Sequence, residues 1–262
     1  MEYFRWNVNP ILLELGPLHL YWYGLLFVGS FVVGSWILKR IYIREGKDFE
    51  VLESLFIYII LGAAIGARLV HCLFYDPTYY LSHPLKIFAI WEGGLASHGG
   101  VMGVLLATWL FSLKYKESFM WLLSRLAIPA ALSGSAIRIG NLMNSEIVGK
   151  PTDVPWAVVF ERIDNLPRHP SQLYESIAYF TIFISLLLVY RAVKPSFATK
   201  ILPALWFLTI FTVRFFLEFV KTKQASYNVD QLLTTGQWLS IPFILLGLVW
   251  LIWAFISEKK ES

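Results

Sequence analysis

Residues 119–142 read FMWLLSRLAIPAALSGSAIRIGNL, a nearly unbroken apolar block of the length that crosses a bilayer as a helix. About twenty apolar residues are needed to span the roughly 30 Å of hydrocarbon in a membrane. The chain of 262 residues is 57% hydrophobic and only 15% charged, whereas soluble domains carry about 25% charged residues. This composition predicts an all-α, polytopic membrane protein. It disfavours the alternative, a soluble all-α protein with a very apolar core.

Similar apolar blocks recur along the chain. Together they predict a single integral membrane domain over residues 1–262 with seven transmembrane helices. The third block is short and rich in glycine, so it is expected to be tilted, broken or partly re-entrant. We expect no cleavable signal peptide, because no basic segment precedes a short apolar stretch at the N-terminus. The spans are expected at about 18–38, 52–75, 97–113, 119–142, 171–190, 201–220 and 237–256.

Basic residues in the loops predict the orientation. They are more numerous after spans one, three, five and seven than in the other loops. Because cytoplasmic loops are enriched in Lys and Arg, the N-terminus is expected outside and the C-terminus in the cytoplasm. The longer connections then lie outside. One is an extracytoplasmic arm region at about 145–170, between spans four and five, with a short strand or interfacial segment at residues 156–160.

Arg138 stands inside the apolar block of span four. A guanidinium near the bilayer centre costs about 2.5–3.5 kcal/mol on insertion scales, and it stays charged at any working pH. Either a buried carboxylate or an anionic lipid headgroup would offset that cost, so helix packing and lipid handling are the two interpretations. Asn141 and Ser145 share the helix face of Arg138. Arg214 is a second such arginine, and Glu218, four residues on, is its alternative internal partner.

Three further polar clusters interrupt the apolar pattern. Tyr23 lies near the start of span one and is also typical of an interfacial aromatic belt. Arg68 and His71 share one helix face, where an arginine that extends to the interface is the alternative. His98 is expected at a helix start, where it is accessible and could act as a base, although a lone histidine is often only structural. Glycines surround His98 and allow close approach of backbone or ligand: Gly94, Gly99, Gly100 and Gly103.

Several functional classes lack their usual motifs. No spacing of Cys, His and carboxylates indicates a metal site, and neither a nucleophile elbow nor a glycine-rich phosphate loop is present. The single Cys72 excludes an intrachain disulfide. We therefore expect no metal and no cofactor. No nucleic-acid partner is expected either, because the net charge of +4 reflects loop bias. An anionic-lipid enzyme, a transporter or channel for an anionic solute and a non-catalytic lipid-binding scaffold all suit inward arginines.

The chain resembles the bacterial prolipoprotein diacylglyceryl transferases in several segments that occur in register. The strongest match is residues 138–149, RIGNLMNSEIVG, which is similar to that family's signature segment. The resemblance extends over nearly the whole chain. Its further segments are 22–25 (WYGL), 66–69 (GARL), 97–100 (SHGG), 168–175 (RHPSQLYE), 214–219 (RFFLEF) and 236–237 (GQ).

The resemblance implies a seven-helix protein of the bacterial cytoplasmic (inner) membrane, with its N-terminus outside. It implies transfer of the diacylglyceryl group from phosphatidylglycerol to the lipobox cysteine of a preprolipoprotein signal peptide. The products would be a thioether-linked lipid and glycerol phosphate, in the first step of lipoprotein maturation. The implied partners are phosphatidylglycerol, the preprolipoprotein and the surrounding membrane lipids.

The resemblance also implies residue roles. His98, Arg138 and Arg214 would be catalytic, with His98 as the thiol base and the arginines near the lipid phosphate. Two positions depart from the family. Ile210 stands where a tyrosine is frequent, so Tyr23 or Tyr174 is expected to supply that hydroxyl if it is needed. Ser145 stands where glycine is common. The residues implied to bind phosphatidylglycerol are Arg138, Asn141, Tyr23, Arg68, Glu146, Gly149 and Glu218.

Overall fold

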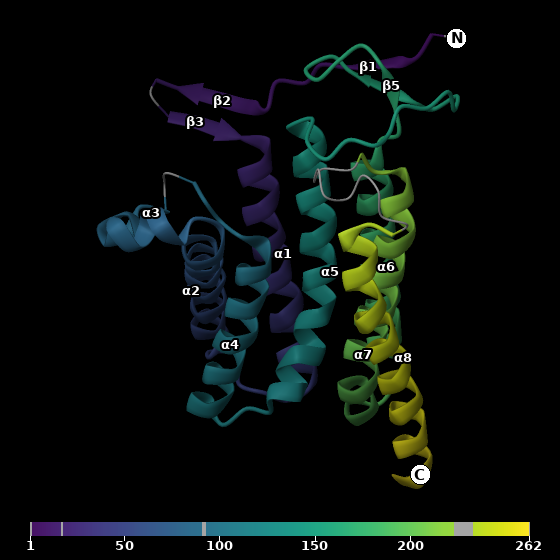
Figure 1. The fold of residues 1–262 in the computed structure, drawn as a ribbon. Coiled ribbons are helices and arrows are strands. Elements are labelled where there is room, and N and C mark those ends of the chain that lie inside the picture. The colour runs from purple at the N-terminus through teal and green to yellow at the C-terminus, as the bar shows by residue number, and fades with distance from the viewer. Residues whose placement is uncertain (1, 17, 91–92, 223–232, 262) are drawn as a thin grey trace. The chain divides into compact units, whose positions relative to one another are not determined.

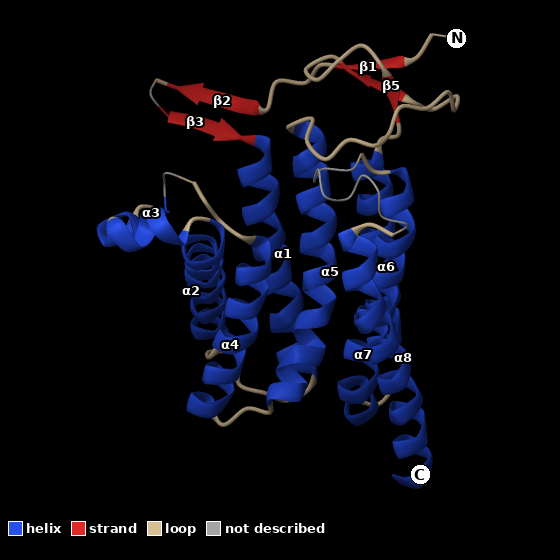
Figure 2. Ribbon diagram, in the orientation of Figure 1, coloured by secondary structure: helices blue, strands red, loops and turns tan. Residues whose placement is uncertain are grey.

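The computed structural model describes residues 2–16, 18–90, 93–222 and 233–261. The chain divides into two compact units, which are considered separately. Unit 1 comprises residues 1–37 and 124–262, and unit 2 comprises residues 38–123. Helices dominate both units, with short strands at one end of unit 1 (Figure 2). The predicted all-α class is therefore confirmed.

Unit 1 is built on long apolar helices. They are the first part of α1 (Trp22–Arg44), most of α5 (Phe119–Met143), α6 (Ser171–Ala192), α7 (Pro195–Leu217) and α8 (Thr235–Glu261). A short 3-10 turn, η4 (Glu218–Val220), continues α7. α7 packs along both α6 and α8 (Figure 1). At Gly247 the two backbones approach so closely that a Cβ would lie 2.5 Å from the Leu208 nitrogen.

The strands of unit 1 lie at the end of the bundle where α1 begins (Figure 1). β1 (Phe4–Trp6) pairs in parallel with β4 (Val158–Phe160), which pairs antiparallel with β5 (Pro167–Arg168). β2 (Ile11–Leu15) and β3 (Leu18–Tyr21) form an antiparallel hairpin. The strand interpretation of residues 156–160 is confirmed over Val158–Phe160. The first span was predicted to start at residue 18, but residues 18–21 are β3 and the helix begins at Trp22.

Unit 2 contains α2 (Leu52–Val70) and α4 (Ser97–Tyr115), which pack closely together. Between them run a π-helical turn η1 (His71–Tyr75), a short helix α3 (Pro77–Ser82) and a 3-10 turn η2 (Pro84–Phe88). Small residues let the two helices meet at backbone distance, as is common between membrane helices. A Cβ on Gly103 would lie 1.9 Å from the carbonyl oxygen of Gly62. The closest contacts come from Gly62, Gly66, Gly99 and Gly103.

Six helical segments of the described chain are long and apolar enough to cross a membrane: α1, α2 with η1, α5, α6, α7 with η4, and α8. Large apolar side chains along them are exposed, among them Val32 and Val249 at 65% each, as expected for surfaces that face lipid. The protein is thus a multi-pass membrane protein. α4 is a further long helix at the place of the third predicted span. The count of seven spans, the orientation and the single-domain organisation stay predictions.

Candidate functional site

The turn after α5 has an unusual backbone. Ser145 and Ile147 adopt left-handed conformations, with φ of 56° and 54°. This region favours glycine and is rare for a β-branched residue, which explains why glycine suits position 145. The turn is held from the start of α6, where Gln172 Nε2 donates to the Glu146 carbonyl at 2.5 Å and Ser171 Oγ donates to the Ile147 carbonyl at 2.7 Å. The strained turn aims the Glu146 side chain back toward α5.

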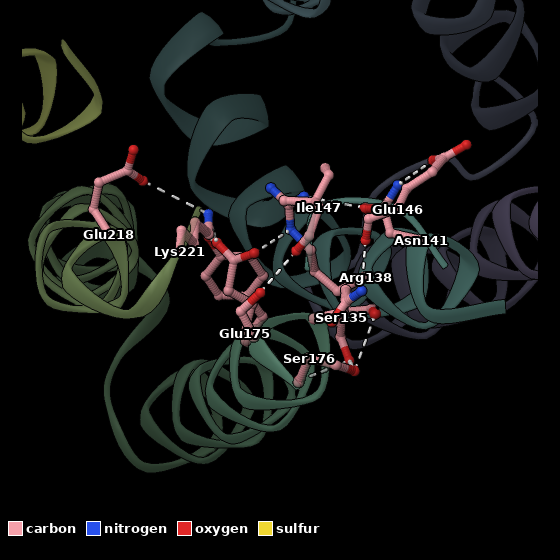
Figure 3. Close-up of polar contacts among 12 residues, drawn as sticks. Ser135, Arg138, Asn141, Glu146, Ile147, Glu175, Ser176, Glu218 and Lys221 are labelled. Carbon is pink, nitrogen blue, oxygen red and sulfur yellow. Dashed lines mark hydrogen bonds and ion pairs between the residues drawn. The ribbon is translucent and has the colours of Figure 1, made fainter. Parts of the chain in front are cut away.

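Arg138, Asn141 and Glu146 form one chain of contacts, as Figure 3 shows. Arg138 Nη1 donates to Asn141 Oδ1 at 3.1 Å, and Asn141 Nδ2 donates to Glu146 Oε2 at 3.1 Å. On its other side, Arg138 Nε lies 3.0 Å from Glu175 Oε2. Two of the three guanidinium nitrogens are thus held by protein groups. The third, Nη2, donates no hydrogen bond of ordinary geometry to any described residue.

Glu175 is the centre of this arrangement, although its carboxylate is completely buried. Its Oε1 accepts a hydrogen bond from Lys221 Nζ at 2.7 Å, and the Tyr179 hydroxyl lies 3.4 Å away. The buried carboxylate considered as the alternative partner of Arg138 is therefore present. It is shared between two cations, and one of them, Lys221, also lies 3.8 Å from Glu218 Oε2. We call Arg138, Asn141, Glu146, Glu175 and Lys221 the polar network.

Sequence reasoning did not assign a role to Glu175 or to Lys221. Glu175 is the last residue of segment 168–175, which resembles the family, but it received no role of its own. Lys221 entered the sequence analysis only as a basic residue in the loop after span six. A carboxylate near the start of a predicted membrane span was the available signal, because intramembrane carboxylates are rare and usually paired. Nothing in the local sequence indicated that Lys221 would be its partner.

Arg214 lies half-buried near the end of α7. Within the described part of the chain it forms no hydrogen bond or ion pair. The alternative Arg214–Glu218 pair is absent, because α7 tightens into η4 at Glu218 and this carboxylate lies 3.8 Å from Lys221 instead. Both Arg138 and Arg214 are close enough to the Tyr179 hydroxyl to act on it electrostatically. Both guanidiniums therefore lie near Tyr179 on α6.

Tyr23 and Gly149 border this site through close packing. The Tyr23 ring lies against Gly140 on α5, where a Cβ would come within 2.6 Å of the ring. Gly149 donates its N–H to the His169 carbonyl at 3.0 Å and accepts from Thr222 Oγ1 at 3.0 Å. A Cβ at Gly149 would lie 2.5 Å from His169. Gly149 thus joins the turn after α5 to the segment after α7 that carries Lys221.

The connection from β4 to α6 is fixed by two polar groupings. Arg168 pairs with Asp164, and its hydrogen bonds hold the pKa of the Asp164 carboxyl below its ordinary value. Tyr174, one candidate for the missing hydroxyl at Ile210, accepts from Trp156 Nε1 at 2.8 Å and lies 3.3 Å from His169 Nδ1. Tyr174 is thus engaged with this connection, whereas Tyr179 is the tyrosine whose hydroxyl contacts the polar network.

In unit 2, Arg68 is buried and holds a loop. Its guanidinium donates to the carbonyls of Lys86, Ile87, Gly93 and Gly94, and it lies over the Tyr80 ring at 4.9 Å. Gly94 has a φ of 72°, and a Cβ there would meet the Arg68 and His71 side chains. Four backbone bonds occupy most of the donors of a guanidinium. The alternative, in which the Arg68 side chain extends to the membrane interface, does not fit these contacts.

His98 lies in the first turn of α4, where its side chain is exposed. It forms no hydrogen bond with a described residue, so a ring nitrogen is available. Arg68 and His98 belong to unit 2, whereas Arg138, Arg214 and the polar network belong to unit 1. In residues 2–16, 18–90, 93–222 and 233–261, no three His, Cys, Asp or Glu side chains gather in a way that could hold a metal ion.

Comparison with known proteins identifies the family to which the chain belongs. A family model described as prolipoprotein diacylglyceryl transferase matches residues 10–253. Three relatives are each named phosphatidylglycerol–prolipoprotein diacylglyceryl transferase. The one from Tolumonas auensis is 53% identical over 98% of both chains. The one from Chloroherpeton thalassium is 47% identical over 95% of this chain and 93% of its own. The one from Bacteroides fragilis is 42% identical over 98% of this chain and 96% of its own.

Proposed function

Because the chain belongs to the prolipoprotein diacylglyceryl transferase family, we propose that Arg138 and Arg214 hold the phosphate of phosphatidylglycerol during transfer. The protein is a transferase that moves a diacylglyceryl group from phosphatidylglycerol to a prolipoprotein. The observation that carries the site assignment is the pair of guanidiniums in unit 1. Arg214 forms no ion pair with a described residue, and Arg138 Nη2 donates no hydrogen bond of ordinary geometry to a described residue, although the Tyr179 hydroxyl interacts with the Arg138 side chain. Guanidiniums bind phosphate oxygens in a bidentate manner.

The reaction forms one bond and breaks one. The thiolate of the lipobox cysteine attacks the glycerol carbon that carries the phosphate, and a sulfur–carbon bond forms. The carbon–oxygen bond to phosphate breaks, and glycerol phosphate leaves with the electron pair. Negative charge grows on the departing phosphate, where preorganised cations in a poorly hydrated site stabilise it most. Arg138 and Arg214 supply that positive charge.

The remaining site residues take supporting roles in this proposal. Asn141 and Glu146 orient Arg138, and Tyr23 and Gly149 border the lipid site. Glu218 acts on Lys221, which lies 3.8 Å away. The role of Arg68 in this proposal is to hold backbone carbonyls that precede α4 within unit 2, because they occupy its donors.

An apolar cleft between α7 and α8 suits an acyl chain of the lipid. Its volume is about 290 Å³. Its wall includes Thr212, Phe215 and Phe216, which flank Arg214 in sequence, and residues of α8 form the other side. The cleft thus lies along the same part of α7 that carries Arg214. The α8 side is formed by Ile241, Ile244 and Leu245.

We also propose that the protein lies in the bacterial cytoplasmic membrane and that its peptide substrate is a preprolipoprotein signal peptide with a lipobox cysteine. The family and the apolar helices support this placement. The strands and the polar network would then lie on the outer side, as the loop charges predict.

The function is tested with purified protein in detergent, phosphatidylglycerol and a lipobox peptide. The expected result is a thioether-linked diacylglyceryl peptide, detected by mass spectrometry, together with glycerol phosphate. A transporter or channel gives no product here, because detergent provides no compartments. Tight lipid binding without product would instead support the scaffold alternative. A peptide with serine in place of the lipobox cysteine is the control and should not react.

We assign the thiol proton to His98, whose exposed ring at the start of α4 has no described hydrogen-bond partner. His98→Gln is expected to lower kcat by roughly 10²–10⁴ at neutral pH, the usual contribution of a general base. The deficit should shrink above about pH 8.5, where a free cysteine ionises unaided. The measurement is the pH profile of kcat, with His19→Gln on exposed β3 as the matched control. An unchanged rate and profile for His98→Gln would place the base elsewhere.

A further inference from the structure

Glu175 is a buried carboxylate between two cations, and the proposed mechanism gives it no role. Its side chain projects from α6 with zero exposure, and its two oxygens face different cations. Oε1 accepts from Lys221 Nζ at 2.7 Å, and Oε2 lies 3.0 Å from Arg138 Nε (Figure 3). The contact with Arg138 is an ion pair by distance, but it lacks the alignment of a hydrogen bond. Glu175 therefore acts on Arg138 chiefly through its charge.

We infer that Glu175 is a positioning residue for diacylglyceryl transfer, which holds Arg138 by its Nε edge so that its Nη2 edge is presented to the lipid phosphate. This inference rests on the proposed function, in which Arg138 contacts the phosphate. A guanidinium is planar and rigid, so two fixed contacts determine its plane. Glu175 at Nε and Asn141 at Nη1 are those contacts. Among the described residues, these contacts leave the Nη2 edge for a ligand, with the Tyr179 hydroxyl as a further group near the Arg138 side chain.

The charges around Glu175 support the same role. Arg138 and Lys221 would repel each other if they lay side by side without an anion between them. Glu175 lies between them and so lets both cations stay at the site, while Glu218 also lies 3.8 Å from Lys221. The Tyr179 hydroxyl, 3.4 Å from Oε1, is a further group at this carboxylate. These contacts within the protein organise the site for the lipid, and preorganisation of this kind is a main source of rate enhancement.

A purely structural ion pair would predict different kinetics. In that case Glu175 would matter for folding, and its loss would affect the protein independently of Arg138. If Glu175 acts through Arg138, its removal should have little further effect once the guanidinium is gone. Residues that act as a unit show such non-additive effects, and a double-mutant cycle measures them.

The test is the cycle of Glu175→Gln, Arg138→Gln and the double variant, assayed in detergent with phosphatidylglycerol and a lipobox peptide. Glu175→Gln keeps the size of the side chain and removes its charge. It is expected to lower kcat by about 10²-fold, as small misplacement of a catalytic group does, with KM changed much less. Arg138→Gln alone should cost roughly 10²–10³. The double variant should be within about threefold of Arg138→Gln.

Three controls keep the outcomes distinct. Thermal melting and size-exclusion profiles establish that each variant is folded. Glu161→Gln removes a carboxylate that pairs with Arg5 among the strands and should leave kcat unchanged. Glu175→Asp keeps the charge and should recover part of the lost rate. If Glu175→Gln does not fold, the double variant Glu175→Ala with Lys221→Met takes its place in the assay. This double variant removes one negative and one positive charge, so no buried charge loses its partner through the Glu175–Lys221 pair.

The outcomes separate this inference from the function on which it rests. Multiplied losses in the double variant, roughly 10⁴–10⁵ in total, would overturn the positioning role and leave Arg138 in place. The same holds if Glu175→Gln is folded and fully active. Full activity of Arg138→Gln would instead overturn the phosphate assignment itself. An equal loss in Arg138→Gln and in the double variant supports the inference.

Discussion

Arg138→Gln is expected to lower the turnover of phosphatidylglycerol and lipobox peptide by on the order of 10²–10³, the usual cost of losing one donor to a developing oxyanion. The glutamine can still bond to Asn141, but it carries no positive charge and cannot pair with Glu175. The buried Glu175 carboxylate then retains Lys221 as its only cation in the polar network. The measurement is the initial rate of thioether formation in detergent. Because the lost interaction is strongest in the transition state, kcat should fall more than KM changes.

Arg138→Lys separates charge from shape. Lysine keeps the positive charge but offers a single nitrogen in place of a planar fork, so it should recover only part of the rate. Arg162→Gln, which removes an exposed arginine from the β4–β5 connection, is the matched control and should turn over normally. Near-normal turnover by a folded Arg138→Gln protein would remove this guanidinium from the mechanism.

Gly103→Ala is expected to be the most damaging single methyl addition among the glycines of unit 2. The new Cβ would lie 1.9 Å from the Gly62 carbonyl oxygen, on the backbone of the facing helix. Since a backbone atom cannot rotate away as a side chain can, α2 and α4 must separate. Overpacking of a well-packed contact costs about 1–3 kcal/mol and sometimes more, and we expect the upper end. This corresponds to a melting temperature lower by roughly 5–10 °C.

Gly100→Ala is the matched control for this change. It lies on the same helix, three residues away, and its Cβ would meet α2 atoms at ordinary distances of 3.6 and 3.7 Å. The measurement is thermal unfolding of both purified variants in the same detergent. Turnover should fall in Gly103→Ala and persist in Gly100→Ala, because His98 lies at the start of the displaced helix. Equal stability of the two variants would contradict the close α2–α4 packing.

Most of the long helices were predictable from sequence because each contains a stretch of about twenty residues that is mainly apolar. The contact between Arg138 and Asn141 was predictable as well, since residues three apart share a helix face. The signature segment was enough to bring Glu146 into the same group. The helices and the contacts among Arg138, Asn141 and Glu146 involve residues close together in sequence, so their spacing is enough to predict them.

The parts that escaped prediction depend on contacts between distant segments. Glu175 meets Lys221 only because the register of α6 against the end of α7 brings them together, and no spacing within one helix encodes that register. The contacts of Arg68 with the backbone carbonyls of Lys86, Ile87 and Gly93 also join distant segments, and the spacing around Arg68 does not encode them. The three-residue strand β1 is too short to show an alternating pattern, and its partner β4 lies far along the chain.

The pairing of β1 with β4 has a consequence for biosynthesis. Phe4 aligns with Val158, and Trp6 aligns with Phe160. Ribosomes add about 5–20 residues per second, so β1 waits roughly ten to thirty seconds for its partner to be made. During that interval the translocation machinery has to insert the intervening hydrophobic helices while the N-terminal strand stays unpaired. This small sheet can therefore close only after more than half of the polypeptide has been synthesised.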